Sequence, residues 1–210
     1  MTGDATRWWW VRHAPVTGHD GKIYGQSDVP CDTSDTASFR ALAHMLPDGA
    51  VWVSSHLGRT LETAAAIRAA GKPAPEPAPE PDFAEQHFGD WQTQSWDDLH
   101  AGGTPEYRAF WENPGHSAAP GGESFADLIV RVTAVMARLN GDHDGRDIVA
   151  VAHGGTIRAA LATALDLKPA RALAIKIDTL SLTRMDYVPG GLFEGQGGMW
   201  RIVSVNVPPR

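Results

Sequence analysis

Cysteine is almost absent from the sequence, since Cys31 is the only one among 210 residues. A single thiol forms no internal disulfide and cannot complete a cysteine-based zinc site, so disulfide scaffolds and zinc fingers are excluded. A chain with so little use for oxidised cysteine fits a reducing compartment. We therefore expect a cytoplasmic protein.

Basic residues are scarce as well. Lys and Arg number 18 against 25 Asp and Glu, which gives a formal net charge of −7 and an isoelectric point near 5.6. Because a general nucleic-acid binder needs a basic face to neutralise phosphates, the charge predicts no nucleic-acid partner.

Long hydrophobic runs are missing too. The apolar stretch near the N-terminus, WWWV, ends at Arg12 and His13 and is far too short for a membrane span. No later segment is long enough, so the sequence predicts no membrane partner. It leaves the oligomeric state open, a homodimer included.

The sequence does have the composition of one folded domain. Hydrophobic residues make up 42% and charged residues 20% of the chain, a balance typical of globular proteins. Since domains usually contain about 50–250 residues, we expect residues 1–210 to form a single domain.

Strand and helix patterns alternate along the chain. Short apolar runs predict strands at 7–12, 50–55 and 147–153. Apolar residues at helical spacing predict helices at 57–65, 125–139 and 157–165. This alternation predicts an α/β fold, a three-layer α/β/α sandwich with a mostly parallel central sheet and a ligand site beyond the carboxyl ends of its strands.

The remaining segments are less regular. The stretch 73–81, PAPEPAPEP, is predicted to be an extended surface connector. Residues 83–122 predict short helices and loops over the strand ends, a lid-like insertion. Late runs at 175–187 and 199–207 predict further strands, an edge hairpin joined by the glycine-rich loop 190–198.

Cationic and imidazole side chains follow all three predicted strands. The first strand ends in Arg12 and His13, the second leads to Arg59, and the third is followed by His153 and Gly154. Arginine offers a planar fork of donors to phosphate oxygens, and histidine can act as nucleophile or proton carrier. Each residue alone fits a surface arginine or a hydrogen-bonded histidine, but together they predict an anion site, strengthened by a helix N-terminus.

Cleavage of a phosphate ester also needs an acid, because an alkoxide is a poor leaving group. Glu85, in DFAEQHFGDWQ, is the best candidate, since the aromatic residues that follow could place it in a partly apolar lid. Taken alone, this residue is more simply a solvated glutamate.

Other catalytic motifs fail on spacing. Ala37 lies six residues after Cys31, where a cysteine-phosphatase loop needs arginine. H-E-x-x-H, G-x-x-x-x-G-K-[ST] and G-x-S-x-G are all absent. The nine histidines show no recognisable ligand spacing, so we predict no metal and no other cofactor.

Five motifs, in order and spacing, resemble the histidine phosphatase superfamily, whose fold is phosphoglycerate-mutase-like. The resemblance runs from about residue 7 to 165. The motifs are VRHA at 11–14, SSHLGRTLETA at 54–64, AEQHFGDW at 84–91, PGGES at 120–124 and VAHGG at 151–155.

The resemblance implies a role for each catalytic candidate. His13 would be the nucleophile that becomes phosphohistidine, while Arg12 and Arg59 hold the phosphoryl oxygens. His153 would complete the phosphate pocket. Glu85 would donate a proton to the leaving group and later activate water. We also expect a backbone carbonyl to fix the tautomer of the nucleophile through its other ring nitrogen.

Further substrate-binding candidates are Gly154, Tyr24 and Gly25. Within the superfamily, GKIYGQSDVP at 21–30 and PGGES look most like small bacterial phosphatases, including α-ribazole-5′-phosphate phosphatases. Glu123 could contribute near the site, or could simply be a charge favoured at a helix start.

Two positions depart from the family pattern. Ala14-Pro15 follows the nucleophile where the family usually has glycine, and proline removes a backbone donor. His19 replaces a frequent asparagine, and with His87 it is a candidate rim residue. Both departures bear on the substrate contacts of the loop 14–28.

The sequence favours a metal-independent phosphomonoesterase that acts on a small phosphorylated metabolite through a phosphohistidine intermediate. A phosphoglycerate mutase is one alternative. A non-catalytic phosphate-binding or interaction module is the other.

Overall fold

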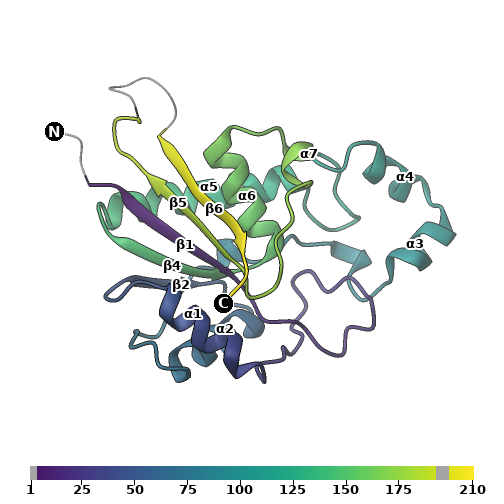
Figure 1. The fold of residues 1–210 in the computed structure, drawn as a ribbon. Helices are drawn as coiled ribbons and strands as arrows, with labels where there is room; N and C mark the ends of the chain where they lie inside the picture. Colours follow the sequence, from purple (N-terminus) through teal and green to yellow (C-terminus); the bar gives the residue numbers. More distant parts are fainter. Residues whose placement is uncertain (1–3, 193–198) are drawn as a thin grey trace.

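The computed structural model describes residues 4–192 and 199–210. Its central sheet has the strand order β3-β2-β4-β1-β5-β6 (Figure 1). The strands are β1 (Thr6–Arg12), β2 (Val51–Ser54), β3 (Ala78–Pro79), β4 (Asp147–Ala152), β5 (Leu182–Tyr187) and β6 (Trp200–Val207). Among these, β5 alone runs against the others, because it pairs antiparallel with both β1 and β6. The predicted α/β fold with a mostly parallel sheet is confirmed.

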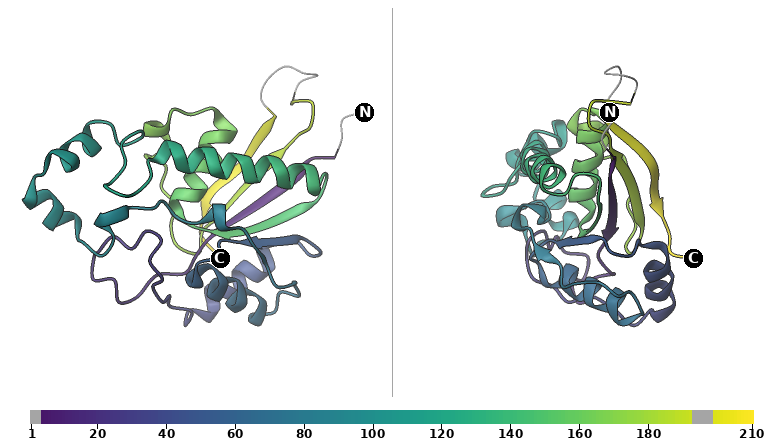
Figure 2. Two further views of the ribbon diagram at one scale, coloured as in Figure 1. Left: turned by 180° about the vertical axis from the view of Figure 1, so that it is seen from behind. Right: turned by 90° about the vertical axis from the view of Figure 1, so that its left-hand side faces the viewer.

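Helices cover both faces of the sheet (Figure 2). They are α1 (Thr36–Met45), α2 (Gly58–Ala69), α3 (Trp96–Gly102), α4 (Pro105–Glu112), α5 (Phe125–Asp142), α6 (Gly154–Leu165) and α7 (Pro169–Ala172), with 3₁₀ turns η1 (Pro81–Phe83) and η2 (Gly89–Trp91). Apolar residues of α1 and α2 pack on one face, and those of α5 and α6 pack on the other. The predicted three layers are therefore present.

The tryptophan-rich β1 shows why this strand is central. Trp8 and Trp10 point to the α5 and α6 side, where their rings stack with centroids 5.1 Å apart. Val11 packs on the opposite face with α1 and α2. The Trp8 indole N–H also donates to the Asn140 side chain at 2.8 Å, so its one polar atom is satisfied. A strand buried on both faces fixes the position of whatever follows its last residue.

Three sequence predictions need correction or completion. The strand predicted at 175–187 is only Leu182–Tyr187, because residues before Leu182 turn back to hydrogen-bond with one another, as in the Ser181 N–H to Asp178 carbonyl bond. Helix α1 was not predicted, although Asp35 caps its N-terminus. Part of the predicted loop 190–198 lies outside the described residues.

The segment that carries α3 and α4 lies beside the sheet rather than on it (Figure 1). It has an apolar cluster of its own, formed by Ile23, Trp91, Leu99, Phe110 and Ala119. Within the described ranges, no helix has the length and apolar character needed to cross a membrane.

Candidate active site

His13 directly follows β1 and is fully buried. Its Nδ1 lies 2.7 Å from the Ala14 carbonyl, which can only accept, so Nδ1 carries the proton and Nε2 has the free lone pair. No described residue hydrogen-bonds Nε2. Burial, together with the charges of Arg59 and Arg12, lowers the pKa of His13 to about 3, against the opposing effect of the Ala14 bond. The imidazole is thus neutral and nucleophilic.

His153 follows β4, the strand that pairs with β1, so the sheet brings the two histidines together. Their ring centroids are 5.2 Å apart. Both ring nitrogens of His153 are buried, without a partner in the described part of the chain. Burial holds its pKa well below the usual value, and the neighbouring His13 and Arg59 act in the same direction. Two neutral imidazoles therefore lie side by side with unused polar atoms.

Arg59 enters the same place from the first turn of α2 and is fully buried. Its Nη2 donates to the Gly25 carbonyl at 2.6 Å and its Nη1 to the Ser27 carbonyl at 2.9 Å. The guanidinium also lies over the Tyr24 ring, 5.0 Å from the centroid. Gly25 and Tyr24, which the sequence offered as substrate contacts, here hold the arginine in position, and Tyr24 also packs edge-on against His13.

Arg12 and the start of α6 complete the cationic side. The Arg12 Nη1 donates to the Ile177 carbonyl at 2.6 Å, while its buried Nε has no partner among the described residues. A Cβ on Gly154 would lie 3.5 Å from that Nε, so the helix backbone passes close to the guanidinium. As the first residue of α6, Gly154 has no intrahelical acceptor for its N–H. Guanidinium and helix terminus together favour a bound anion.

Glu85 lies across from these residues and is anchored at both carboxylate oxygens. Oε2 accepts from the Gly155 N–H at 3.2 Å, and Oε1 accepts from the Gln86 N–H at 3.0 Å. A Cβ on Gly155 would overlap with Oε1. Glycine at 155 therefore leaves free the space that the carboxylate occupies at the start of α6.

An ion pair that the sequence analysis missed fixes the backbone around Glu85. Arg131 donates to the carbonyls of Ala84 and Glu85 at 2.9 and 3.0 Å. It also pairs with Glu123 at 2.6 Å. Glu123 also accepts a hydrogen bond from the His87 N–H at 2.8 Å. Its carboxylate therefore binds Arg131 and a backbone N–H of this segment. Glu123 precedes α5 and Arg131 lies eight residues later within it. This spacing is not one of the i,i+3 or i,i+4 spacings by which an ion pair on a helix can be recognised in a sequence.

The two departures from the family pattern lie in the loop after His13. The Ala14 N–H donates to the Thr63 hydroxyl at 2.9 Å, which ties the loop to α2. The carbonyl of Pro15 accepts from the Asp32 N–H at 2.7 Å. His19 lies against Tyr24, with ring centroids 5.5 Å apart, and so is one ring removed from His13. Both backbone polar groups of Ala14, the residue before the proline, are therefore hydrogen-bonded: its N–H to Thr63 and its carbonyl to His13.

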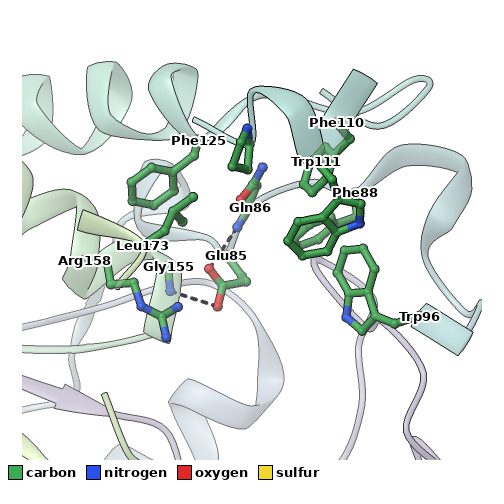
Figure 3. A pocket seen from close by; sticks show the side chains of 11 residues that line it. Glu85, Gln86, Phe88, Trp96, Phe110, Trp111, Phe125, Gly155, Arg158 and Leu173 are labelled. Carbon is green, nitrogen blue, oxygen red and sulfur yellow. Dashed lines mark hydrogen bonds between the residues drawn. The ribbon is translucent and has the colours of Figure 1, made fainter. Parts of the chain in front are cut away.

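A cavity of about 320 Å³ opens beside Glu85 (Figure 3). Its lining comes from the segment 85–114, from the start of α5 and from α6. The lining residues are Glu85, Gln86, Phe88, Trp96, Phe110, Trp111, Pro114, Phe125, Gly155, Arg158 and Leu173. Arg158 was not predicted from the sequence, although it lies one helical turn after Gly154. Its Nε donates to the Ile175 carbonyl at 2.7 Å.

The remaining histidines do not gather into a metal site. Across residues 4–192 and 199–210, no three His, Cys, Asp or Glu side chains form a group that could hold a metal ion. Burial and Glu62 raise the pKa of Cys31 to about 11, so its thiol is not a nucleophile at neutral pH.

This arrangement of imidazoles, guanidiniums and one carboxylate at the strand ends defines the class of protein. A family model described as histidine phosphatase superfamily (branch 1) matches residues 8–197. The match spans most of the chain, so the protein belongs to the histidine phosphatase superfamily. The family resemblance seen in the sequence is confirmed.

Particular relatives are similar over much of the chain. Phosphoglycerate mutase-like protein 4 of Arabidopsis thaliana is 33% identical, over 70% of this chain and 66% of that protein. Glucosyl-3-phosphoglycerate phosphatase of Mycobacterium tuberculosis is 30% identical, over 91% of this chain and 90% of that protein. The α-ribazole phosphatase structure from Shigella flexneri has a TM-score of 0.78, covers 97% of this chain and 98% of that one, and at 22% identity supports the shared fold.

The chain matches only part of the length of several relatives. It covers 66% of the Arabidopsis protein and 37% of further mycobacterial relatives, which is less than two thirds of the length of several curated proteins that it matches. Those proteins therefore contain segments outside the matched region.

Proposed function

We propose that the protein is a metal-independent phosphomonoesterase that hydrolyses a small phosphorylated metabolite through a phosphohistidine intermediate. The observation that carries this proposal is the state of His13. Its Nδ1 is occupied by the Ala14 carbonyl, while Nε2 is buried, neutral and free of any partner among the described residues. A buried nitrogen with an unused lone pair beside two guanidiniums is suited to attack phosphorus.

In the first step, the Nε2 of His13 attacks phosphorus, the N–P bond forms, and the ester P–O bond breaks. Arg12, Arg59 and His153 would hold the equatorial oxygens, whose negative charge they stabilise in a buried site. The leaving oxygen takes the proton of the Glu85 carboxyl group, so the alcohol departs neutral. The products are the alcohol, phosphohistidine and the Glu85 carboxylate.

In the second step, the Glu85 carboxylate takes a proton from water while the water oxygen attacks phosphorus. The N–P bond breaks, inorganic phosphate forms, and the lone pair returns to Nε2. Glu85 is protonated again and the cycle closes. Its two hydrogen bonds, from Gly155 and Gln86, support this role because they keep the carboxylate at the start of α6.

The segment 83–122 supplies Glu85 and most of the cavity wall. We propose that it acts as a lid over a single catalytic domain formed by residues 1–210. The names of relatives suggest substrates to screen, glucosyl-3-phosphoglycerate and α-ribazole-5′-phosphate among them. A phosphoglycerate mutase remains the second candidate, favoured by the name of the Arabidopsis relative.

Trapping of the intermediate tests the mechanism. Acid-labile, alkali-stable phosphate should attach to His13 when the protein is mixed with labelled substrate in excess chelator and quenched in alkali. His13→Ala should lose the label and turnover, whereas His44→Ala should retain both, because His44 is exposed on α1.

Three results would count against the proposal. If the unmodified protein turns over substrate no faster than His13→Ala, at the uncatalysed rate, the enzyme proposal fails and a binding module is left. Activity that disappears with chelator would contradict the metal-free mechanism. Conversion of 3-phosphoglycerate to 2-phosphoglycerate without free phosphate would identify a mutase.

A further inference from the structure

The cavity beside Glu85 has an unusual lining for a site that must hold an alcohol. Five of its eleven lining residues are aromatic: Phe88, Trp96, Phe110, Trp111 and Phe125. Trp96 and Trp111 have ring centroids 5.5 Å apart, and Phe88 lies edge-on to Trp96 at 5.9 Å. Figure 3 shows Phe88, Trp96, Phe110 and Trp111 grouped on one side of Glu85, whose carboxylate is directed toward Gly155 and Arg158. A leaving group must reach that carboxylate.

Polar partners in the cavity are few. Gln86 already donates its side-chain amide to the Glu123 carbonyl at 3.0 Å. Arg158 donates its Nε to the Ile175 carbonyl, and its Nη groups, which have no partner among the described residues, are the main polar donors left in the wall. A polyhydroxylated leaving group would lose its hydrogen bonds to water here and regain few of them, which is costly. The lining is better suited to a flat apolar group.

Trp111 gives a second, independent indication. Its side chain is 52% exposed although it borders the cavity and contacts Trp96. A large aromatic residue left in contact with water at the mouth of a site has area available for a ligand.

We propose that this cavity selects phosphomonoesters whose alcohol carries an aromatic ring close to the ester oxygen. The inference rests on the proposed function, because the cavity holds a leaving group only if Glu85 protonates one. The ring stacks or packs edge-on among Phe88, Trp96 and Trp111, while the phosphoryl group reaches His13. Selectivity then comes from the wall of the cavity and not from the phosphate pocket.

Benzyl phosphate and ethyl phosphate separate ring recognition from leaving-group chemistry, because both release primary alcohols of similar acidity. We expect kcat/KM for benzyl phosphate to exceed that for ethyl phosphate by about tenfold or more, as one aromatic contact provides. Trp111→Ala should reduce this ratio several-fold, because benzyl phosphate should lose more turnover than ethyl phosphate. Trp96→Leu should reduce it as well.

Trp200→Ala is the matched control, because Trp200 is a partly buried tryptophan on the distant strand β6. It should leave the ratio unchanged. Binding of benzylphosphonate against ethylphosphonate, followed by calorimetry, gives a readout that needs no turnover. The benzyl compound should bind more tightly to the unmodified protein, and less so to Trp111→Ala.

The outcomes distinguish the two proposals. Equal turnover of benzyl and ethyl phosphate, both dependent on His13, would overturn the ring selectivity and leave the phosphatase intact. Tighter binding of benzylphosphonate without hydrolysis of any ester would overturn the phosphatase and keep the aromatic site. A ratio unaffected by both Trp111→Ala and Trp96→Leu would place ring recognition elsewhere.

Discussion

The phosphate pocket and the aromatic cavity adjoin at Glu85 but are built in opposite ways. His13, His153 and Arg59 follow three neighbouring strands and are fully buried, so the core of the sheet holds them. The cavity wall comes largely from α3, α4 and their loops beside the sheet, and its outer tryptophan is half exposed. We therefore propose that a rigid scaffold fixes the reaction, while replaceable side chains on short helices select the alcohol.

The two regions also differ in what they contribute to stability. The pocket buries ring nitrogens of His13 and His153 that have no partner among the described residues, which costs stability and marks a functional site. The aromatic rings of the cavity region instead pack on one another. Substitutions in the pocket should therefore affect all substrates alike, whereas those in the cavity should depend on the alcohol.

Arg59→Gln tests the pocket with the largest expected effect. It removes a guanidinium from the phosphoryl oxygens, so kcat/KM should fall by about 10²–10³-fold, the loss typical of one preorganised donor. Steady-state assays with p-nitrophenyl phosphate and an alkyl phosphate should give the same loss for both. A loss confined to one substrate would contradict the division between the two regions.

Gly155→Ala tests Glu85, where the phosphate pocket and the aromatic cavity adjoin. The added Cβ would collide with the Glu85 carboxylate, so protonation of the leaving group should suffer and turnover of alkyl phosphates should fall by about 10²-fold. Turnover of p-nitrophenyl phosphate, which releases a good leaving group, should fall much less. Gly141→Ala is the control, because a Cβ there meets nothing within 4 Å. Equal losses on both substrates would remove Glu85 as the acid.

Glu123→Gln should have a smaller effect, because it acts through the Arg131 clamp on the Glu85 backbone. We expect kcat on alkyl phosphates to fall by about tenfold with little change in KM. Asp147→Asn breaks a comparable ion pair, that of Asp147 with Arg7, at the start of β4 and therefore at the opposite end of that strand from His153. It should leave kcat unchanged. Arg131→Lys should restore less than full activity, since lysine cannot make the same fork of bonds.

Acid stability should report on the pocket. The pKa of buried His13 is about 3 when folded and near 6.5 when unfolded, so between these values the unfolded chain binds more protons. Stability is then complete above pH 6.5 and falls as the pH drops towards 3, by up to about 1.4 kcal/mol per pH unit for this one group. Denaturant unfolding at pH 7 and pH 5 in phosphate-free buffer should show His13→Ala to be less pH-sensitive than His44→Ala. An equal pH dependence would contradict a buried neutral His13.

The sequence predicted the pocket better than its surroundings, for a physical reason. Strands β1, β2 and β4 have clear apolar runs, so the residues that follow them could be placed together from topology alone. Glu85 was chosen as the candidate acid because cleavage of a phosphate ester requires a proton donor. Arg131 and Arg158 were missed because their partners are backbone carbonyls, Ala84 and Ile175 among them, which leave no mark in the sequence.

The aromatic cavity was foreseen only as a lid of short helices. Its residues lie at irregular spacing, and which faces of α3 and α4 meet depends on tertiary packing rather than on periodicity. Helix α1 was missed for a different reason, since its capping residue Asp35 lies in a polar stretch that reads as a loop.

The hydrogen bond from His13 to the Ala14 carbonyl makes the tautomer of His13 insensitive to the side chain at position 14. Every amino acid supplies the same carbonyl, so a substitution at position 14 cannot delete the acceptor that sets the histidine tautomer. Pro15 also restricts the preceding residue to extended backbone, which limits where that carbonyl can point. The chain can thus depart from glycine after His13 and still keep the protonation state of His13.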